Sequence, residues 1–98
     1  MADRRDVRVE ILDVAAVDDM AGKVQSAAGR PEMNHKVRTW REKHRVTTAK
    51  DGYSFAVVGE TLMYLHRAPD GMIIPHASYP DGTEKVYTDH DHAEAAYG

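Results

Sequence analysis

The sequence predicts an α+β fold in which an N-terminal strand and two helices precede an antiparallel β-meander of three to five strands. Three observations indicate this class. Apolar residues alternate near the N-terminus, recur with helical spacing as far as His44, and alternate again between Arg45 and His66. The chain has 98 residues, which is enough for one hydrophobic core. We therefore expect a single domain over residues 1–88 and a polar C-terminal tail over residues 89–98.

The composition excludes several classes of protein. The chain contains no cysteine, so it has no disulfide bond, no thiolate zinc site and no cysteine nucleophile. No apolar run approaches the roughly 18 residues of a membrane helix, and residues 1–9 lack the apolar segment of a signal peptide. We therefore expect a soluble protein that is made in a cytoplasm, with no membrane contact and no cofactor.

The first strand and the first helix follow from the spacing of apolar residues. The segment Val7–Leu12 alternates apolar with mostly charged residues, which is typical of a strand. In Val14–Ala28 the apolar residues fall on one helical stripe, and Asp13 precedes them as a good N-cap. Gly29 and Pro31 then end the helix, because glycine favours the position after a helix and proline cannot continue one.

A second helix is predicted over Pro31–His44. Its apolar residues form one helical stripe made of Met33, Val37, Trp40 and His44. Alternation around Val37 would also allow the start of a strand. We expect Trp40 to anchor the core against the sheet rather than to stack on a nucleic-acid base, because a large aromatic side chain contributes much of the buried area in a small domain.

Two turn signals set the register of the meander. Asp51-Gly52 is typical of a two-residue hairpin turn, and Gly59-Glu60 can form a second one. Each turn independently places the same residues on one face of the sheet. We expect the two helices to pack on this face, which carries Val46, Phe55, Val57, Leu62 and Tyr64.

The opposite face of the meander is also apolar. Its residues include Met63 and Leu65, and a fourth strand, Met72–His76, adds Ile74 if a tight turn is centred on Pro69-Asp70. An apolar face of this kind needs a cover, and the rest of the chain is too polar to supply one. We therefore predict that Met63, Leu65 and Ile74 form part of an interface with another protein chain, such as a second copy.

The charge of the chain is unevenly distributed. The net charge is −3, yet the segment from Arg30 to Arg45 carries six basic and two acidic residues, so the remainder carries −7. Arg38, Arg41 and Arg45 form a basic flank on the second predicted helix. Such a flank is compatible with a nucleic-acid contact, with packing against an acidic face of another copy, or with an ordinary solvated helix surface. The nucleic-acid contact is not favoured, and we add the three arginines to the predicted interface.

Residues that could carry chemistry are sparse. His90 and His92 form an H-x-H pair that can bind zinc from an extended segment, but the spacing specifies no third ligand and a solvated tail explains the pair more simply. The predicted turn places His66 and His76 on opposite faces, so they would not share a metal. The sequence contains no nucleophile elbow, phosphate-binding loop or H-E-x-x-H motif. We therefore expect no metal site and no enzymatic activity.

The order of strand, two helices and antiparallel meander resembles the small endoribonuclease toxins of the RelE-like type. That resemblance implies cleavage of RNA by acid–base chemistry without a metal ion. The residues of the right kinds are Arg38, Arg41, Arg45, Tyr64, His66 and Arg67. This function is the alternative to the one favoured next.

Between Val7 and Tyr87, the same order of elements together with an apolar second sheet face is also similar to small virion proteins of long-tailed bacteriophages, namely the tail-completion and neck proteins of the head–tail junction. The resemblance implies a non-enzymatic structural or assembly protein that works as a homo-oligomer or ring. Its partners would be copies of itself and neighbouring virion proteins. It would be located in the virion after synthesis in the host cytoplasm.

Overall fold

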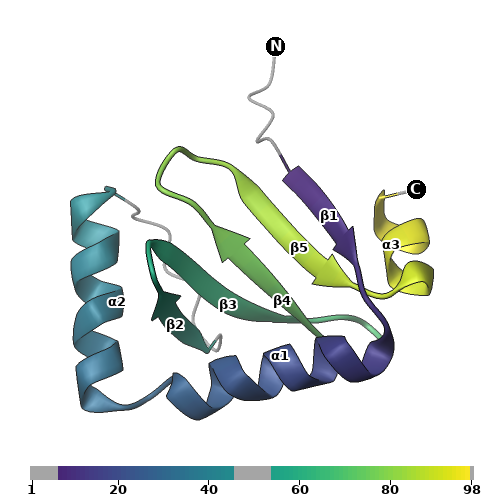
Figure 1. The fold of residues 1–98 in the computed structure, drawn as a ribbon, viewed down its shortest axis with the longest axis horizontal. Helices are drawn as coiled ribbons and strands as arrows, with labels where there is room; N and C mark the ends of the chain where they lie inside the picture. Colours follow the sequence, from purple (N-terminus) through teal and green to yellow (C-terminus); the bar gives the residue numbers. More distant parts are fainter. Residues whose placement is uncertain (1–6, 46–53, 98) are drawn as a thin grey trace.

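The computed structural model describes residues 7–45 and 54–97. They form an N-terminal strand, two helices, a mostly antiparallel set of strands and a C-terminal helix, so the predicted α+β class and element order are confirmed (Figure 1). The elements are β1 (Val7–Ile11), α1 (Val14–Ala27), α2 (Pro31–Lys43), β2 (Phe55–Val58), β3 (Thr61–Arg67), β4 (Ile73–Ser78), β5 (Glu84–Thr88) and α3 (His90–Tyr97).

The described strands form one sheet in the order β1-β5-β4-β3-β2. β1 runs parallel to β5, whereas the other neighbouring strands are antiparallel. The first strand of the chain therefore lies beside the last one, at an edge of the sheet. Within the described part of the chain, β2 forms the other edge.

The hairpin between β2 and β3 has the predicted register. Phe55 pairs with Tyr64, Val57 with Leu62 and Val58 with Thr61. Gly59 adopts a φ of +62°, which is the left-handed conformation that the first position of this turn requires. The pairs expected around Asp51-Gly52 lie outside the described residues.

The register predicted for β4 was wrong by one residue. His66 pairs with Ile74 rather than Ile73, and His76 pairs with Tyr64 rather than Met63. The reason is the length of the loop: Ala68 N donates to Met72 O at 2.8 Å, so three residues rather than two form the turn. Gly71 makes the longer loop possible with a φ of +93°. A slip of one residue moves every β4 side chain to the other face.

One face of the sheet, here called the α1 face, carries Ala56, Met63 and Leu65. Ala21 and Val24 of α1 pack there against Ala56 and Leu65, and Met63 is part of the same cluster. The periodic apolar stripe of α1 therefore covers the sheet as an amphipathic helix does.

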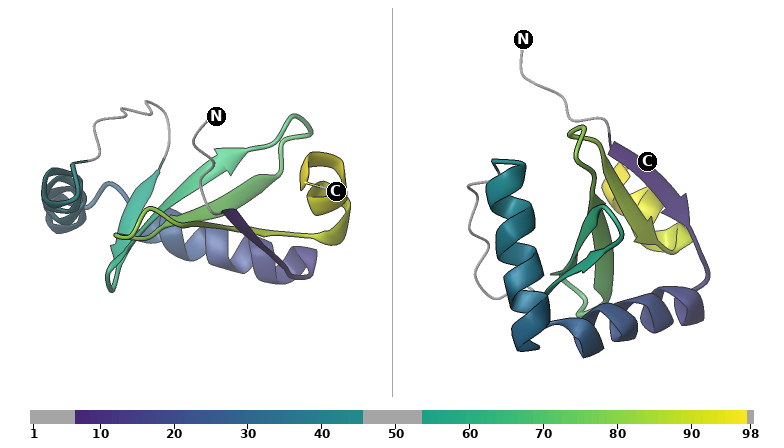
Figure 2. Two further views of the ribbon diagram at one scale, coloured as in Figure 1. Left: turned by 90° about the horizontal axis from the view of Figure 1, so that it is seen from above. Right: turned by 60° about the vertical axis from the view of Figure 1, so that its left-hand side comes forward.

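The second helix packs on the other face, here called the α2 face, which carries Phe55, Leu62, Tyr64, Ile74, His76 and Val86. Val37 and Trp40 of α2 form a core with Leu62 there. Trp40 is 7% exposed and its Nε1 donates to Glu60 O at 2.9 Å, so its predicted role as a core anchor is confirmed. The expectation that both helices pack on one face was wrong: α1 crosses under the sheet and α2 stands beside its β2 edge (Figure 2).

Residues 90–97 form a helix where we expected a polar tail. Asp89 begins α3 as its N-cap, since its Oδ1 accepts from His92 N at 2.9 Å and its carbonyl oxygen accepts from Ala93 N at 3.0 Å. Ala93 is buried, and α3 packs against β1. α3 and α2 lie at opposite ends of the molecule (Figure 1).

None of the helices in the described part of the chain has both the length and the apolar character needed to cross a membrane.

Candidate functional site

A cluster of polar side chains lies on the α2 face where three adjacent strands meet. Tyr64 on β3 is directly opposite His76 on β4, and Glu84 on β5 lies diagonally from His76. The Tyr64 hydroxyl lies 3.1 Å from His76 Nδ1 and donates to Glu84 Oε1. His76 Nδ1 is also 3.1 Å from the same carboxylate oxygen. The three groups therefore form one closed hydrogen-bonded set, here called the Tyr64 cluster.

Aromatic and cationic side chains extend the Tyr64 cluster on both sides. The ring of His66 lies 5.5 Å from that of His76, measured between centroids. On the other side Phe55 lies 5.9 Å from Tyr64, and the Arg41 guanidinium sits 4.2 Å above the Phe55 ring. The prediction that His66 and His76 lie on opposite faces was therefore wrong, because it depended on the incorrect β4 register.

The Tyr64 cluster is largely shielded from solvent. Tyr64 is 6% exposed, and the side chains of His76 and Glu84 are 13% and 12% exposed. Buried polar groups of this kind are stable when they satisfy one another, as these do. Imidazole, phenol and carboxylate are also the groups that exchange protons with a bound ligand. The arrangement is thus suited either to a buried polar network that favours one specific packing of the core or to acid–base chemistry.

A second polar cluster joins α3 to the turn between β3 and β4. His92 Nδ1 lies 2.7 Å from Asp89 Oδ1, and His92 Nε2 lies 2.7 Å from Asp70 Oδ2. Both ring nitrogens can donate only when the ring is an imidazolium, so the two carboxylates favour the charged form. We call this arrangement the His92 clamp.

The pKa values in the His92 clamp shift as this geometry requires. Hydrogen bonds to Asp89 and then to Asp70 raise the pKa of His92 above its usual 6.5. The backbone N–H of Met72 and then the His92 ring lower the pKa of Asp70 below 3.8. The backbone N–H and then the ring of His92 lower the pKa of Asp89 in the same direction. All three pKa shifts favour the state in which the His92 ring is protonated and both carboxylates are ionised.

The clamp also separates the two histidines considered as zinc ligands. His92 turns toward Asp70 and Asp89, whereas the His90 side chain is 74% exposed and lies 3.6 Å from Glu94. The pair lies on a helix rather than an extended segment, so the two side chains do not share a face. Among the residues that the structure describes, no three His, Asp or Glu side chains are arranged to hold a metal ion.

The apolar residues of the predicted interface do not form one open surface. Met63 and Leu65 belong to the core under α1, and Ile74 lies on the α2 face with 8% exposure. The apolar face that we expected to be uncovered is therefore covered by α1. This difference follows from the placement of the helices on opposite faces.

The basic residues of the predicted interface all belong to the α2 end of the molecule. Arg38 lies on α2 and Arg45 just after it, and both are exposed. Arg41 is half-buried, and its Nε has no hydrogen-bond partner among the described atoms. Arg67 lies apart from Tyr64 and His66, since alternation along β3 places it on the α1 face.

Sequence reasoning missed the apolar residues that are exposed. Val7, Ile11, Val14 and Tyr97 are 42%, 53%, 50% and 49% exposed, and they lie on β1, at the start of α1 and at the end of α3. Val58, on β2, is 58% exposed. The first group lies at an edge of the sheet because β1 pairs in parallel with β5. No local sequence pattern encodes that pairing, so the exposure of these residues could not be predicted.

Comparisons with protein-family models, with curated proteins and with solved structures find no match for this chain.

Proposed function

We propose that the protein is a non-enzymatic assembly subunit that works as a homo-oligomer. The observation that carries this proposal is the group of exposed apolar side chains around β1, namely Val7, Ile11, Val14 and Tyr97. Large apolar side chains that are exposed on neighbouring elements of a small domain are typical of a surface that contacts another protein. Each is about half exposed, so its full burial would contribute roughly 1 kcal/mol.

The setting that we propose is the virion of a long-tailed bacteriophage, at the head–tail junction or in the tail. The support is the order of elements, which is that of the resemblance drawn from the sequence. Neighbouring virion proteins would then be partners in addition to copies of this chain. Negative-stain electron microscopy of the purified protein tests this setting: ring-shaped or stacked particles support it, and isolated monomers contradict it.

Light scattering after size-exclusion chromatography tests self-association directly. The wild-type protein is expected to form species larger than a monomer as its concentration rises. Ile11→Asp places a charge in the apolar patch and is expected to weaken this association at least about tenfold. Gln25→Asp is the control, because Gln25 is exposed on α1, away from the apolar residues around β1. A wild-type protein that stays monomeric at all concentrations overturns the proposal.

One observation favours a second candidate, metal-independent cleavage of RNA. Tyr64, His66 and His76 lie together on the α2 face, and Arg41 lies on the same side beyond Phe55. Cleavage of this type uses the 2′-hydroxyl as nucleophile, so the protein needs only a base, an acid and a cation near the phosphate.

Incubation of the protein with single-stranded RNA in the presence of EDTA tests this candidate. Cleavage is expected to disappear in His76→Ala and in Tyr64→Phe. Arg67→Ala is the matched control, because Arg67 belongs to the same strand but to the α1 face, and it should retain activity. Absence of cleavage by the wild-type protein, together with harmless expression in a bacterial host, rejects the candidate.

A further inference from the structure

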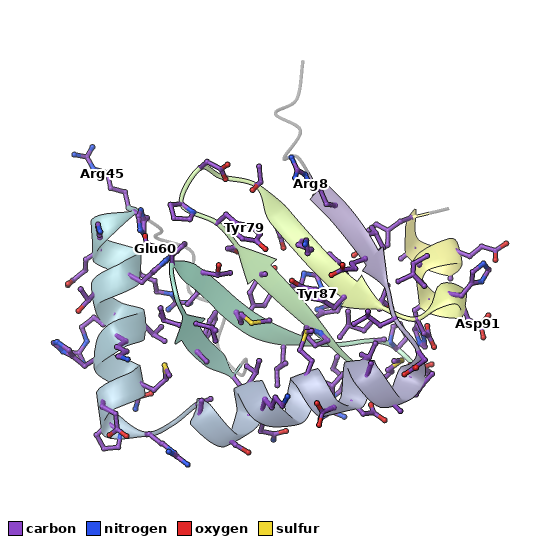
Figure 3. The ribbon with its side chains drawn as sticks, in the orientation of Figure 1. Arg8, Arg45, Glu60, Tyr79, Tyr87 and Asp91 are labelled. Atoms are coloured by element: carbon purple, nitrogen blue, oxygen red, sulfur yellow. The ribbon has the colours of Figure 1, made fainter. Side chains whose placement is uncertain are left out.

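The two ends of the molecule carry opposite charge. The basic end is α2 with its flanking residues, which carry six arginine and lysine side chains and two glutamates between Arg30 and Arg45. The acidic end is α3 with its N-cap and the β3–β4 turn that it contacts, and its carboxylates are Asp70, Asp89, Asp91 and Glu94. Figure 3 shows Arg45 and Asp91 projecting outward from these opposite ends.

Within the described residues, several charges at each end have no Lys, Arg, Asp or Glu partner of opposite sign. In residues 7–45 and 54–97, no carboxylate lies within ion-pair distance of Lys36, Arg38, Lys43 or Arg45. At the acidic end, the side chains of Asp91 and Glu94 are 96% and 73% exposed. Among the described residues, the His90 ring is the one basic group within ion-pair distance of either carboxylate. Lys85, in contrast, is already 3.8 Å from Glu10.

Each end also combines its charge with apolar surface. The exposed Ile11, Val14 and Tyr97 lie at the acidic end. At the basic end Val58 is 58% exposed, and an open groove of about 280 Å³ lies between α2 and the β2–β3 turn. Lys36, Trp40 and Lys43 are among the residues that line this groove. Apolar contact surrounded by opposite charges is the composition of a specific protein interface.

We infer that copies of this chain associate head to tail, with the basic α2 end of one copy against the acidic α3 end of the next. This inference rests on the proposed function, which requires self-association but specifies no surfaces. A symmetric dimer through either end would bring like charges together, which is unfavourable. A contact between two different ends is heterologous, and repetition of it produces a closed ring or an open filament.

Charge reversal at each end tests the inference. The basic-end variant is Arg38→Glu/Lys43→Glu, and the acidic-end variant is Asp91→Lys/Glu94→Lys. Each is expected to weaken self-association at least about tenfold, because repulsion replaces attraction at two positions. A chain that carries all four changes has the original net charge and complementary ends again, so it should regain association. Lys23→Glu/Gln25→Glu, on the exposed side of α1, is the control and should associate normally.

The outcomes separate this inference from the proposed function. A wild-type protein that associates equally well in all variants overturns the head-to-tail contact and leaves the proposed function intact. A wild-type protein that is monomeric overturns both. If the basic-end variant loses binding to a single-stranded oligonucleotide but still self-associates, the basic end is a polyanion site and the inference is wrong. Circular dichroism verifies that every variant is folded.

Discussion

The hydroxyl group of Tyr64 lies between the carboxylate of Glu84 and the imidazole of His76, on a side chain that is almost completely buried. Tyr64→Phe removes this hydroxyl and keeps the ring. Each of the two neighbours then loses a hydrogen-bond partner in a poorly solvated place. We expect the free energy of unfolding to fall by about 1–2 kcal/mol, as measured by urea denaturation.

Tyr97→Phe provides the comparison for Tyr64→Phe. Tyr97 is 49% exposed, so water replaces whatever its hydroxyl contacts. The free energy of unfolding should change by less than about 0.5 kcal/mol. Equal losses in the two variants would mean that the Tyr64 cluster contributes no specific stability.

The His92 clamp makes stability depend on pH in a predictable direction. The raised pKa of His92 means that its contribution is fully present below pH 6.5 and is lost as the pH rises through its higher folded value. The lowered pKa values of Asp70 and Asp89 mean that their contributions are present above pH 3.8 and are lost as the pH falls through their folded values. The clamp is therefore most stabilising between these limits. Urea denaturation from about pH 2 to about pH 9 measures both sides of this profile.

His92→Ala is the variant that isolates the clamp. It should remove the loss of stability that the wild-type protein shows above pH 6.5, because His92 is the ring that links α3 to the β3–β4 turn through a hydrogen bond to Asp70. His90→Ala is the matched control, since the His90 side chain is mostly exposed and contacts only α3 residues among the described ion pairs. A profile that is unchanged in His92→Ala contradicts the assignment.

At the scale of elements, two glycines predict opposite effects of the same substitution. Gly22 lies inside α1, and Gly71 lies in the β3–β4 loop with a φ of +93°. A Cβ atom at either position meets nothing within 4 Å, so only the backbone decides the outcome. Gly22→Ala should raise the free energy of unfolding by about 0.5–1 kcal/mol, because glycine is unfavourable within a helix. Gly71→Ala should lower it by about 1 kcal/mol, because an L-residue is strained in the left-handed region. Thermal and urea unfolding measure both, and a change of the same sign in the two variants contradicts the argument.

The same loop shows how far elements can be predicted from sequence. The signals at Asp13 and at Gly59 are local, so the start of α1 and the β2–β3 register were predicted correctly. The stretch Ala68–Gly71 allows either a two-residue or a three-residue loop, and the structure has the three-residue loop, which places Ile74 and His76 on the α2 face. Asp89 followed by an alanine-rich segment is a pattern that predicts the helix α3. The charged residues in that segment led instead to the prediction of a polar tail.

At the scale of the whole molecule, the contacts that define the candidate sites are distant in sequence. β1 pairs with β5, and α1 and α2 pack on opposite faces of the sheet, although both have an apolar stripe of the same kind. Local spacing encodes neither the strand pairing nor the face that each helix covers, because both depend on which surface remains when the other elements have packed. The Tyr64 cluster and the exposed patch around β1 both follow from these long-range contacts. The basic segment between Arg30 and Arg45, in contrast, was visible in the sequence, and the fold places α2, which carries most of it, at the opposite end of the molecule from α3.

An interface that combines charges with apolar side chains should respond to two independent variables. Raising the salt concentration from about 0.05 M to about 0.5 M shortens the Debye length from about 14 Å to about 4 Å, so self-association of the wild-type protein should weaken steadily. Tyr97→Ala removes apolar area at the acidic end and leaves every charge, so it should weaken association at each salt concentration without changing the slope. Arg38→Glu/Lys43→Glu should instead flatten or reverse the slope. Sedimentation velocity at several salt concentrations distinguishes these responses. An association that salt leaves unchanged in the wild-type protein means that the subunits meet through apolar surface alone.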